Sequence, residues 1–429
     1  MGQLSVAQAF DPRRNSIDFL RWLLAFLVIF SHAGPIAGFY GGEDLGIQIS
    51  SEQSLGGVAV GGFFFFSGFL ITKSRMGRST IWRYFWRRCL RIFPAFWAAL
   101  AVTVTVFAPL AWHSKHGTFS GYWQAVTEAP RTYFLNNMFL ELGQRNIAEL
   151  GDTVPYFLGH QARDWNGSAW TLKYEFLCYI IVGLLGLFGA LSSRFFATAF
   201  AATCIGLNFL QWSGAVDLAS VNPIFADPYL LMFAAPFGFG MIFALYGEKI
   251  MVDDRVAFGM LAFGLCTYAA GGWNAIGQYG FQYFLMWFGI RVPITGWAKH
   301  GDFSYGIYIF AWPLMYLATF FQYERHGWFV YHATIVVLVH VMAFISWHLI
   351  EKPAMSLKNW TPRWLGATIA VWTPAAERVK AKIVAPNFSS TRYAAKVREE
   401  RRLREERAAQ EERMAREERK PQEVSAGDQ

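Results

Sequence analysis

Three ionisable side chains in one apolar segment could carry out acid–base chemistry. In RRNSIDFLRWLLAFLVIFSHAG, Asp18 and Arg21 lie near one end and His32 lies near the other. An α-helix turns about 100° per residue, which places all three on one stripe, with His32 roughly 22 Å beyond Asp18. Asp18 and Arg21 are three residues apart and can pair. An ionisable group in a bilayer costs several kcal/mol unless it is paired or hydrated. The stripe therefore predicts either a reactive histidine that faces the bundle interior or a histidine that is hydrogen-bonded to a neighbouring helix.

A carboxylate in a later apolar segment is the predicted partner of His32. Glu175 lies in WNGSAWTLKYEFLCYI, about one turn inside the predicted outer boundary of its helix, and so near the depth of His32. A carboxylate beside a histidine can orient the ring and raise its basicity. His32 and Glu175 are therefore the predicted catalytic residues. A salt bridge within the bundle is the alternative role for Glu175.

A cluster of arginines could bind phosphate groups. In IWRYFWRRCLRIFP, Arg87, Arg88 and Arg91 lie on adjacent helical turns with aromatic residues between them. Guanidinium forks bind phosphate bidentately, and the indoles of Trp82 and Trp86 could stack on a nucleotide base. The segment predicts a phosphate site, and simple anchoring by positive charge is the alternative.

Other polar and small residues carry weaker expectations. Ser67 interrupts an aromatic run and could open a narrow cavity, while Gly57 and Gly61 form a GxxxG pattern that predicts close helix packing. His113 and His116 are spaced HxxH in a predicted loop without further ligands nearby, so no metal site is expected.

These residues must be positioned by membrane helices. The chain has 429 residues, of which 54% are hydrophobic and 16% are charged, whereas about a quarter of a soluble domain is charged. Apolar segments near the roughly 20 residues that a bilayer requires predict an all-α polytopic membrane protein of about ten transmembrane helices. The eighth segment contains Arg291 and Pro293 and could be re-entrant. The predicted spans are 17–38, 55–73, 92–112, 169–190, 194–212, 228–247, 255–272, 279–297, 302–321 and 329–350.

The charge of the loops predicts how the spans are oriented in the membrane. The loop after the second span carries seven lysines and arginines, whereas the loops at 39–54, 213–227 and 273–278 carry none. Since lysine and arginine concentrate in cytoplasmic loops, both termini are predicted to be cytoplasmic. Topology and anionic lipid headgroups explain the net charge of +8, so no nucleic-acid partner is expected.

The predicted organisation is a membrane domain, residues 1–355, followed by a charged cytoplasmic tail, residues 356–429. Within the membrane domain, residues 113–168 form a long extracytoplasmic loop. The end of the tail has charges of alternating sign at helical spacing, which predicts an exposed helix or a disordered segment. A helix that binds a partner or that forms a homo-oligomer is the alternative.

The ordered motifs resemble those of the acyltransferase 3 family, which are multi-pass membrane O-acyltransferases of bacterial glycans. The resemblance covers roughly residues 13–355. It is carried by SIDFLRWLLAFLVIFSHAG, GGFFFFSGFLIT, RRCLRIFP, SAWTLKYEF, SYGIYIF and IEKP.

The resemblance implies a role for each matched residue. His32 is similar to the catalytic histidine, and Arg88 and Arg91 are similar to the arginine pair on the acyl-CoA side. Many relatives have a histidine where this chain has Ala311, so a mechanism with a second histidine there is not expected. Supporting positions on the matched motifs are Asp18, Arg21, Ser67, Trp170 and Tyr305.

The expected function is transfer of an acyl group, by default acetyl, from cytoplasmic acyl-CoA to a hydroxyl group of an extracytoplasmic glycan or glycosylated acceptor. The expected location is the bacterial inner (plasma) membrane, with acyl-CoA as a co-substrate and no permanently bound cofactor. His32 would act as general base or carry the acyl group transiently. A polytopic transporter or flippase of a glycan-related substrate, or a non-catalytic membrane scaffold, are the alternatives.

Overall fold

The computed structural model describes residues 4–76, 80–153, 164–187, 189, 191 and 194–360. In these ranges the chain is built from helices, and the only β-type pairing is two isolated bridges. The predicted all-helical class is confirmed. Most of the predicted charged tail lies outside the described residues, which end at 360.

Seven helical segments of the described chain are long and apolar enough to cross a membrane, which agrees with a multi-pass membrane protein. The predicted spans at 255–272, 279–297 and 302–321 correspond to shorter helices, and their crossing of the bilayer stays a prediction. The seven segments are Ile17–Ala37, Leu55–Met76, Ile81–His116, Gly167–Leu187, Phe195–Trp212, Pro228–Tyr246 and Trp328–Asn359.

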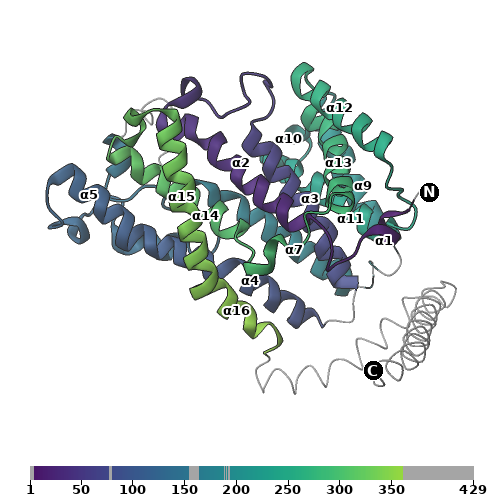
Figure 1. Ribbon diagram of the computed structural model, residues 1–429, viewed down its shortest axis with the longest axis horizontal. Coiled ribbons are helices and arrows are strands. Elements are labelled where there is room, and N and C mark those ends of the chain that lie inside the picture. The colour runs from purple at the N-terminus through teal and green to yellow at the C-terminus, as the bar shows by residue number, and fades with distance from the viewer. Residues whose placement is uncertain are drawn as a thin grey trace, which may run out of the picture. The chain divides into compact units, whose positions relative to one another are not determined.

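Helix α2 (Ile17–Ala37) runs through the middle of the bundle between α3 (Leu55–Met76) and α14 (Ser304–Phe320), both of which pack along it (Figure 1). The other helices surround this trio. In chain order they are α1 (Val6–Ala9), α4 (Ile81–Val102), α5 (Ala108–His116), α6 (Pro130–Asn137), α7 (Leu172–Leu187), α9 (Phe195–Trp212), α10 (Leu218–Val221), α11 (Pro228–Tyr246), α12 (Asp254–Ala270), α13 (Gln278–Arg291), α15 (Trp328–Ser346) and α16 (Lys352–Ser356).

The closest helix pair, α3 and α11, depends on glycines other than those expected. A Cβ atom at Gly68 would overlap the carbonyl oxygen of Phe237, and one at Gly240 would overlap that of Phe65. The predicted packing role of Gly57 and Gly61 is wrong. A Cβ at Gly61 would meet nothing within 4 Å, and the atoms nearest to one at Gly57 belong to the side chain of Gln53, a few residues earlier in the chain. Backbone contact between helices therefore occurs one to three turns further along α3 than the GxxxG pattern suggested.

The arginine segment belongs to a long helix and not to a loop before one. Helix α4 begins at Ile81, continues through Pro94 and runs by way of a π-helical stretch, Thr103–Phe107, into α5. Neighbouring helices can accommodate a proline inside a membrane helix. The helix therefore begins eleven residues before the predicted span, 92–112, which lies inside it, and the arginines project from the first three turns of a continuous rod.

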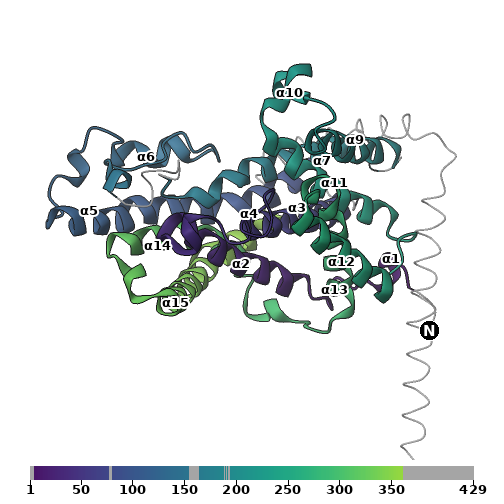
Figure 2. The same ribbon diagram turned by 90° about the horizontal axis from the view of Figure 1, so that it is seen from above.

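Helices α5 and α6 lie at the end of the bundle opposite α12 and α13 (Figures 1 and 2). His113 and His116 belong to the last turn of α5, so the loop assigned to them in the sequence is in fact helical. The predicted extracytoplasmic loop, 113–168, contains α6 and two short 3₁₀ turns among its described residues, while residues 154–163 lie outside the description.

Candidate active site

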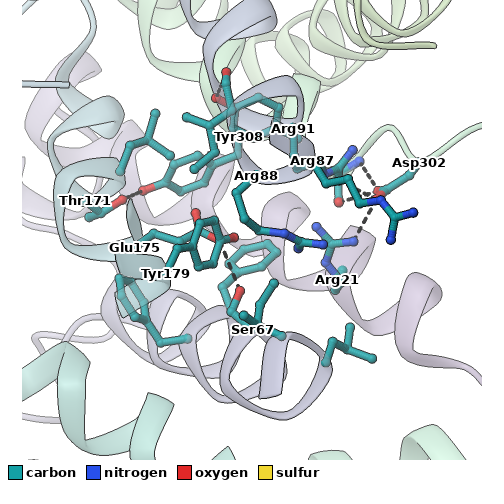
Figure 3. A pocket seen from close by; sticks show the side chains of 18 of the residues that line it. Arg21, Ser67, Arg87, Arg88, Arg91, Thr171, Glu175, Tyr179, Asp302 and Tyr308 are labelled. Atoms are coloured by element: carbon teal, nitrogen blue, oxygen red, sulfur yellow. Dashed lines mark hydrogen bonds and ion pairs between the residues drawn. The ribbon is translucent and has the colours of Figure 1, made fainter. Parts of the chain in front are cut away.

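A cavity of about 480 Å³, here called the central cavity, lies between α3, α4, α7 and α14 (Figure 3). Arg21 from α2 and the segment that follows α15 complete its wall. Of the predicted site residues it brings together Arg21, Ser67, Arg87, Arg88, Arg91, Glu175 and Tyr305.

Two of the cavity arginines are neutralised by carboxylates. Arg21 and Arg91 both donate to Oδ2 of Asp302, with Arg21 at 2.7 Å, and Arg91 Nη1 also lies 3.6 Å from Oε2 of Glu351. Arg21, Arg91, Asp302 and Glu351 form a four-residue ion cluster with two charges of each sign, and the side chains are 3% to 22% exposed. The predicted pairing of Asp18 with Arg21 is wrong. Asp18 is exposed and has no ion pair within 4.0 Å in the described chain.

Arg88 has a different environment from Arg91. Its guanidinium packs over the rings of Tyr84 and Tyr179, 5.9 and 5.7 Å from their centroids, and its Nε is buried without a hydrogen-bond partner. Figure 3 shows its side chain extending between the Glu175 side and the Asp302 side of the central cavity. No carboxylate of the described residues pairs with Arg88, so its charge is available to an anion.

Two further cations lie at the same end of the central cavity. Arg87 hydrogen-bonds to Oδ1 of Asn359 at 3.2 Å, and Lys358 also lines the cavity. Neither side chain pairs with a carboxylate in the part of the chain that the structure describes. Arg87, Arg88 and Lys358 together therefore give this end of the cavity three uncompensated positive charges.

The opposite end of the central cavity is closed by hydroxyl groups. The hydroxyl groups of Thr171 and Tyr308 lie 2.6 Å apart, and Tyr308 also donates to the carbonyl of Ser168 at 2.8 Å. Tyr305 donates to the carbonyl of Ile92 at 2.8 Å, and its ring lies under Arg91. These bonds fix the side chains that form the inner wall of the cavity.

Glu175 is part of the central cavity but does not meet His32. Its Oε1 accepts hydrogen bonds from Ser67, at 3.0 Å, and from the hydroxyl of Tyr179. The predicted pairing is wrong, because Glu175 bonds to Ser67 whereas His32 lies next to Gly56, and these two residues of α3 are eleven positions, or roughly 16 Å, apart along the helix. Trp170, another predicted site residue, faces away from the cavity and packs against Tyr229 at 4.5 Å.

The partner of His32 is Asp44, which sequence reasoning missed. Nδ1 of His32 lies 3.0 Å from Oδ1 of Asp44, and the two side chains are 19% and 32% exposed. The imidazole packs edge-on against Trp312, at 4.8 Å between ring centroids. Asp44 stands twelve residues after His32 in a glycine-rich turn, so its side-chain type was visible in the sequence but its position was not.

His32 lies one helical turn beyond the closed end of the central cavity. It contacts Trp312 on α14, and a Cβ at Gly56 on α3 would lie 3.5 Å from its Cε1. The cavity wall ends at Tyr308 and Val60, each four residues away along the same helices. Four residues of α-helix span roughly 6 Å, so a thin layer of side chains separates the cavity from the imidazole.

A second carboxylate lies on the far side of Trp312. The indole of Trp312 donates to the backbone carbonyl of Asp164 at 2.6 Å, and the Asp164 carboxylate pairs with Arg145 at 3.3 Å. Burial raises the pKa of Asp164 to about 6, although Arg145 opposes the shift. This residue was also not singled out from the sequence.

Known proteins are similar to this chain over most of its length. Residues 14–351 match the Acyltransferase domain family, Acyl_transf_3. The chain is 26% identical over 378 residues to nodulation protein 10 of Rhizobium leguminosarum bv. viciae, covering 81% of this chain and 94% of the relative. It is 25% identical over 358 residues to the O-acetyl transferase of Shigella phage Sf6, covering 79% and 96%. No solved structure matches significantly.

The family match extends over both parts of the candidate site. It begins just before the helix that carries His32 and ends at Glu351 of the ion cluster. This chain belongs to the acyltransferase 3 family of membrane acyltransferases.

Proposed function

We propose that this acyltransferase moves an acetyl group from cytoplasmic acyl-CoA to a hydroxyl group of an extracytoplasmic glycan or glycosylated acceptor, in the bacterial inner (plasma) membrane. The observation that carries the proposal is the central cavity, with three uncompensated cations at one end and its other end one turn from His32. The name of the phage relative, an O-acetyl transferase, supports acetyl as the group transferred.

The cationic end suits the phosphates of acyl-CoA. Arg88 has an unused buried N–H, and a guanidinium binds phosphate oxygens through parallel hydrogen bonds. Arg87 and Lys358 add charge beside it. The extended thiol arm of the donor would then lie along the aromatic wall towards Tyr308, which directs the thioester to the side of the cavity nearest His32.

The proposed reaction needs one base. The acceptor hydroxyl gives its proton to Nε2 of His32 while its oxygen attacks the thioester carbonyl. The carbon–sulfur bond then breaks, an ester bond forms, and the imidazolium returns the proton to the thiolate of coenzyme A. Since Asp44 accepts at Nδ1, the nitrogen opposite it remains for the hydroxyl.

The test uses the full chain in lipid nanodiscs. The donor is radiolabelled acetyl-CoA, and the acceptor is the cell's own envelope polysaccharide after mild alkaline removal of its ester groups. Label in the polysaccharide and release of free thiol are both measured. We expect His32→Ala to abolish both while leaving acetyl-CoA binding intact. A transporter would release no thiol.

The matched control is His348→Ala. His348 is half-buried in the π-helical turn Trp347–Glu351 that follows α15, does not line the central cavity, and its Nδ1 is bonded to the carbonyl of Phe344 at 2.9 Å. It should retain full transfer. Near-normal transfer by His32→Ala would show that the base is elsewhere.

A further inference from the structure

The turn that follows α2 folds back onto its own helix. The helix ends at Gly38, whose φ of 76° is left-handed, and Gly41 and Gly42 also have positive φ values, which favour glycine. The fit is tight, because a Cβ at Gly34 would overlap the carbonyl oxygen of Glu43. This return brings Asp44 beside the last turns of α2.

A chain of hydrogen bonds then fixes the Asp44 carboxylate. The backbone N–H of Gly56 donates to Oγ of Ser31 at 2.9 Å, and Oγ of Ser31 donates to Oδ1 of Asp44 at 3.1 Å. The backbone of Leu45 also donates to the carbonyl of Ser31 at 3.2 Å. The Asp44 carboxylate therefore bonds to Ser31 as well as to His32. Ser31 is in turn fixed by its bond to the backbone of α3.

The same bonds determine which ring nitrogen of His32 carries the proton. An ionised carboxylate can only accept hydrogen bonds, so Nδ1 of His32 must be the donor to Asp44. In the neutral ring, Nε2 is then unprotonated and has a free lone pair. A histidine acts as a base through the nitrogen opposite its orienting carboxylate.

We propose that Asp44 is a positioning residue, which fixes the tautomer and the ring orientation of His32 and stabilises the imidazolium that forms during transfer. The inference rests on the proposed function of His32. Asp44 is the only charged side chain that pairs with His32 among the described residues. The ring also packs against the uncharged indole of Trp312, and a Cβ at Gly56 would lie 3.5 Å from its Cε1.

The main test is Asp44→Asn, which keeps the shape of the side chain and removes its charge. An asparagine amide can present N–H to Nδ1 and so stabilise the wrong tautomer. Loss of a buried triad aspartate lowers kcat by about 10⁴. The Asp44 side chain is 32% exposed, so a smaller fall of about 100-fold in kcat is expected. The KM for acetyl-CoA should not change, since Asp44 does not line the central cavity.

The pH profile separates positioning from a purely structural role. The carboxylate favours the protonated ring, so its removal should shift the acidic limb of the kcat profile to lower pH, by about half a unit for a partly exposed pair. Asp44→Glu retains the charge and should restore part of kcat and the original limb. A structural role would change protein yield and thermal stability but leave the limb in place.

The matched control is Glu43→Gln, one residue earlier on the same turn. Glu43 is exposed, and its side chain makes no ion pair in the described chain. It should leave kcat and the pH profile unchanged. If His32→Ala is inactive while Asp44→Asn keeps normal kcat and pH dependence, the inference about Asp44 is wrong and the proposed function stands. If His32→Ala is active, the proposed function itself fails.

Discussion

The two central arginines, Arg88 and Arg91, should respond to mutation in opposite ways. Sequence reasoning treats them as one phosphate-binding pair, whereas the structure gives Arg91 two carboxylate neighbours and Arg88 none. Arg88→Ala should therefore weaken donor binding without unfolding the protein. Arg91→Ala should destabilise the protein instead.

The size of each effect follows from these contacts. A hydrogen bond to a charged group contributes about 1.5–3 kcal/mol, so loss of the Arg88 contact should raise the Kd of the donor roughly 10- to 100-fold. Removal of one partner from a buried ion pair costs about 3–5 kcal/mol. Glu351 is only 3% exposed and would lose its cation in Arg91→Ala, so the upper part of that range applies.

The assay is equilibrium binding of coenzyme A to the full chain in nanodiscs, with thermal unfolding measured on the same samples. Arg91→Lys keeps the charge and provides a folded variant if Arg91→Ala cannot be isolated. Arg83→Ala is the control, because Arg83 is exposed on the same helix and does not line the central cavity. The reasoning is refuted if Arg88→Ala binds coenzyme A normally, or if Arg83→Ala weakens binding as much as Arg88→Ala.

Three further predictions concern stability, each measured by thermal unfolding of the purified protein. Gly68→Ala should lower the free energy of unfolding by about 1–3 kcal/mol, because its Cβ would overlap the backbone of Phe237, which cannot move aside easily. Asp302→Asn should lower the unfolding temperature by removing the carboxylate shared by two arginines, and raised ionic strength should not rescue it. Asp164→Asn should stabilise the protein at pH 8 but not at pH 4. The raised folded pKa of about 6, which already includes the opposing effect of Arg145, means that stability is lost as pH rises from the unfolded value of 3.8, by roughly 3 kcal/mol; an equal effect at both pH values would contradict this.

The main helices and the opening of Ser67 onto a cavity were predictable from the sequence, whereas the presence of the arginines in the same cavity was not. Hydropathy locates a helix from the local residues alone, and positions along one helix can be counted. The stripe that contains Arg21 and His32 follows from that count, and Ser67 does open onto a cavity as the interrupted aromatic run suggested.

The partners of these residues were not predictable, because each is set by geometry outside the helix that carries the residue. Asp302 is 281 positions from Arg21 along the chain. Asp44 reaches His32 only because several residues of the turn adopt left-handed conformations. Glu175 bonds to Ser67 and not to His32 because of how α7 packs along α3, and hydropathy does not report where two helices meet.

The bond between Thr171 and Tyr308 also has a consequence for the membrane as a permeability barrier. Arginines line one end of the central cavity, and the imidazole lies beyond its other end. Each proton that crosses 100 mV releases about 2.3 kcal/mol, so a continuous wet path between the two would dissipate the membrane potential of the cell at every turnover. The hydroxyl pair belongs to the layer of side chains between the central cavity and the imidazole. The proposed transfer would therefore require this layer to open for a thioester and to close to water.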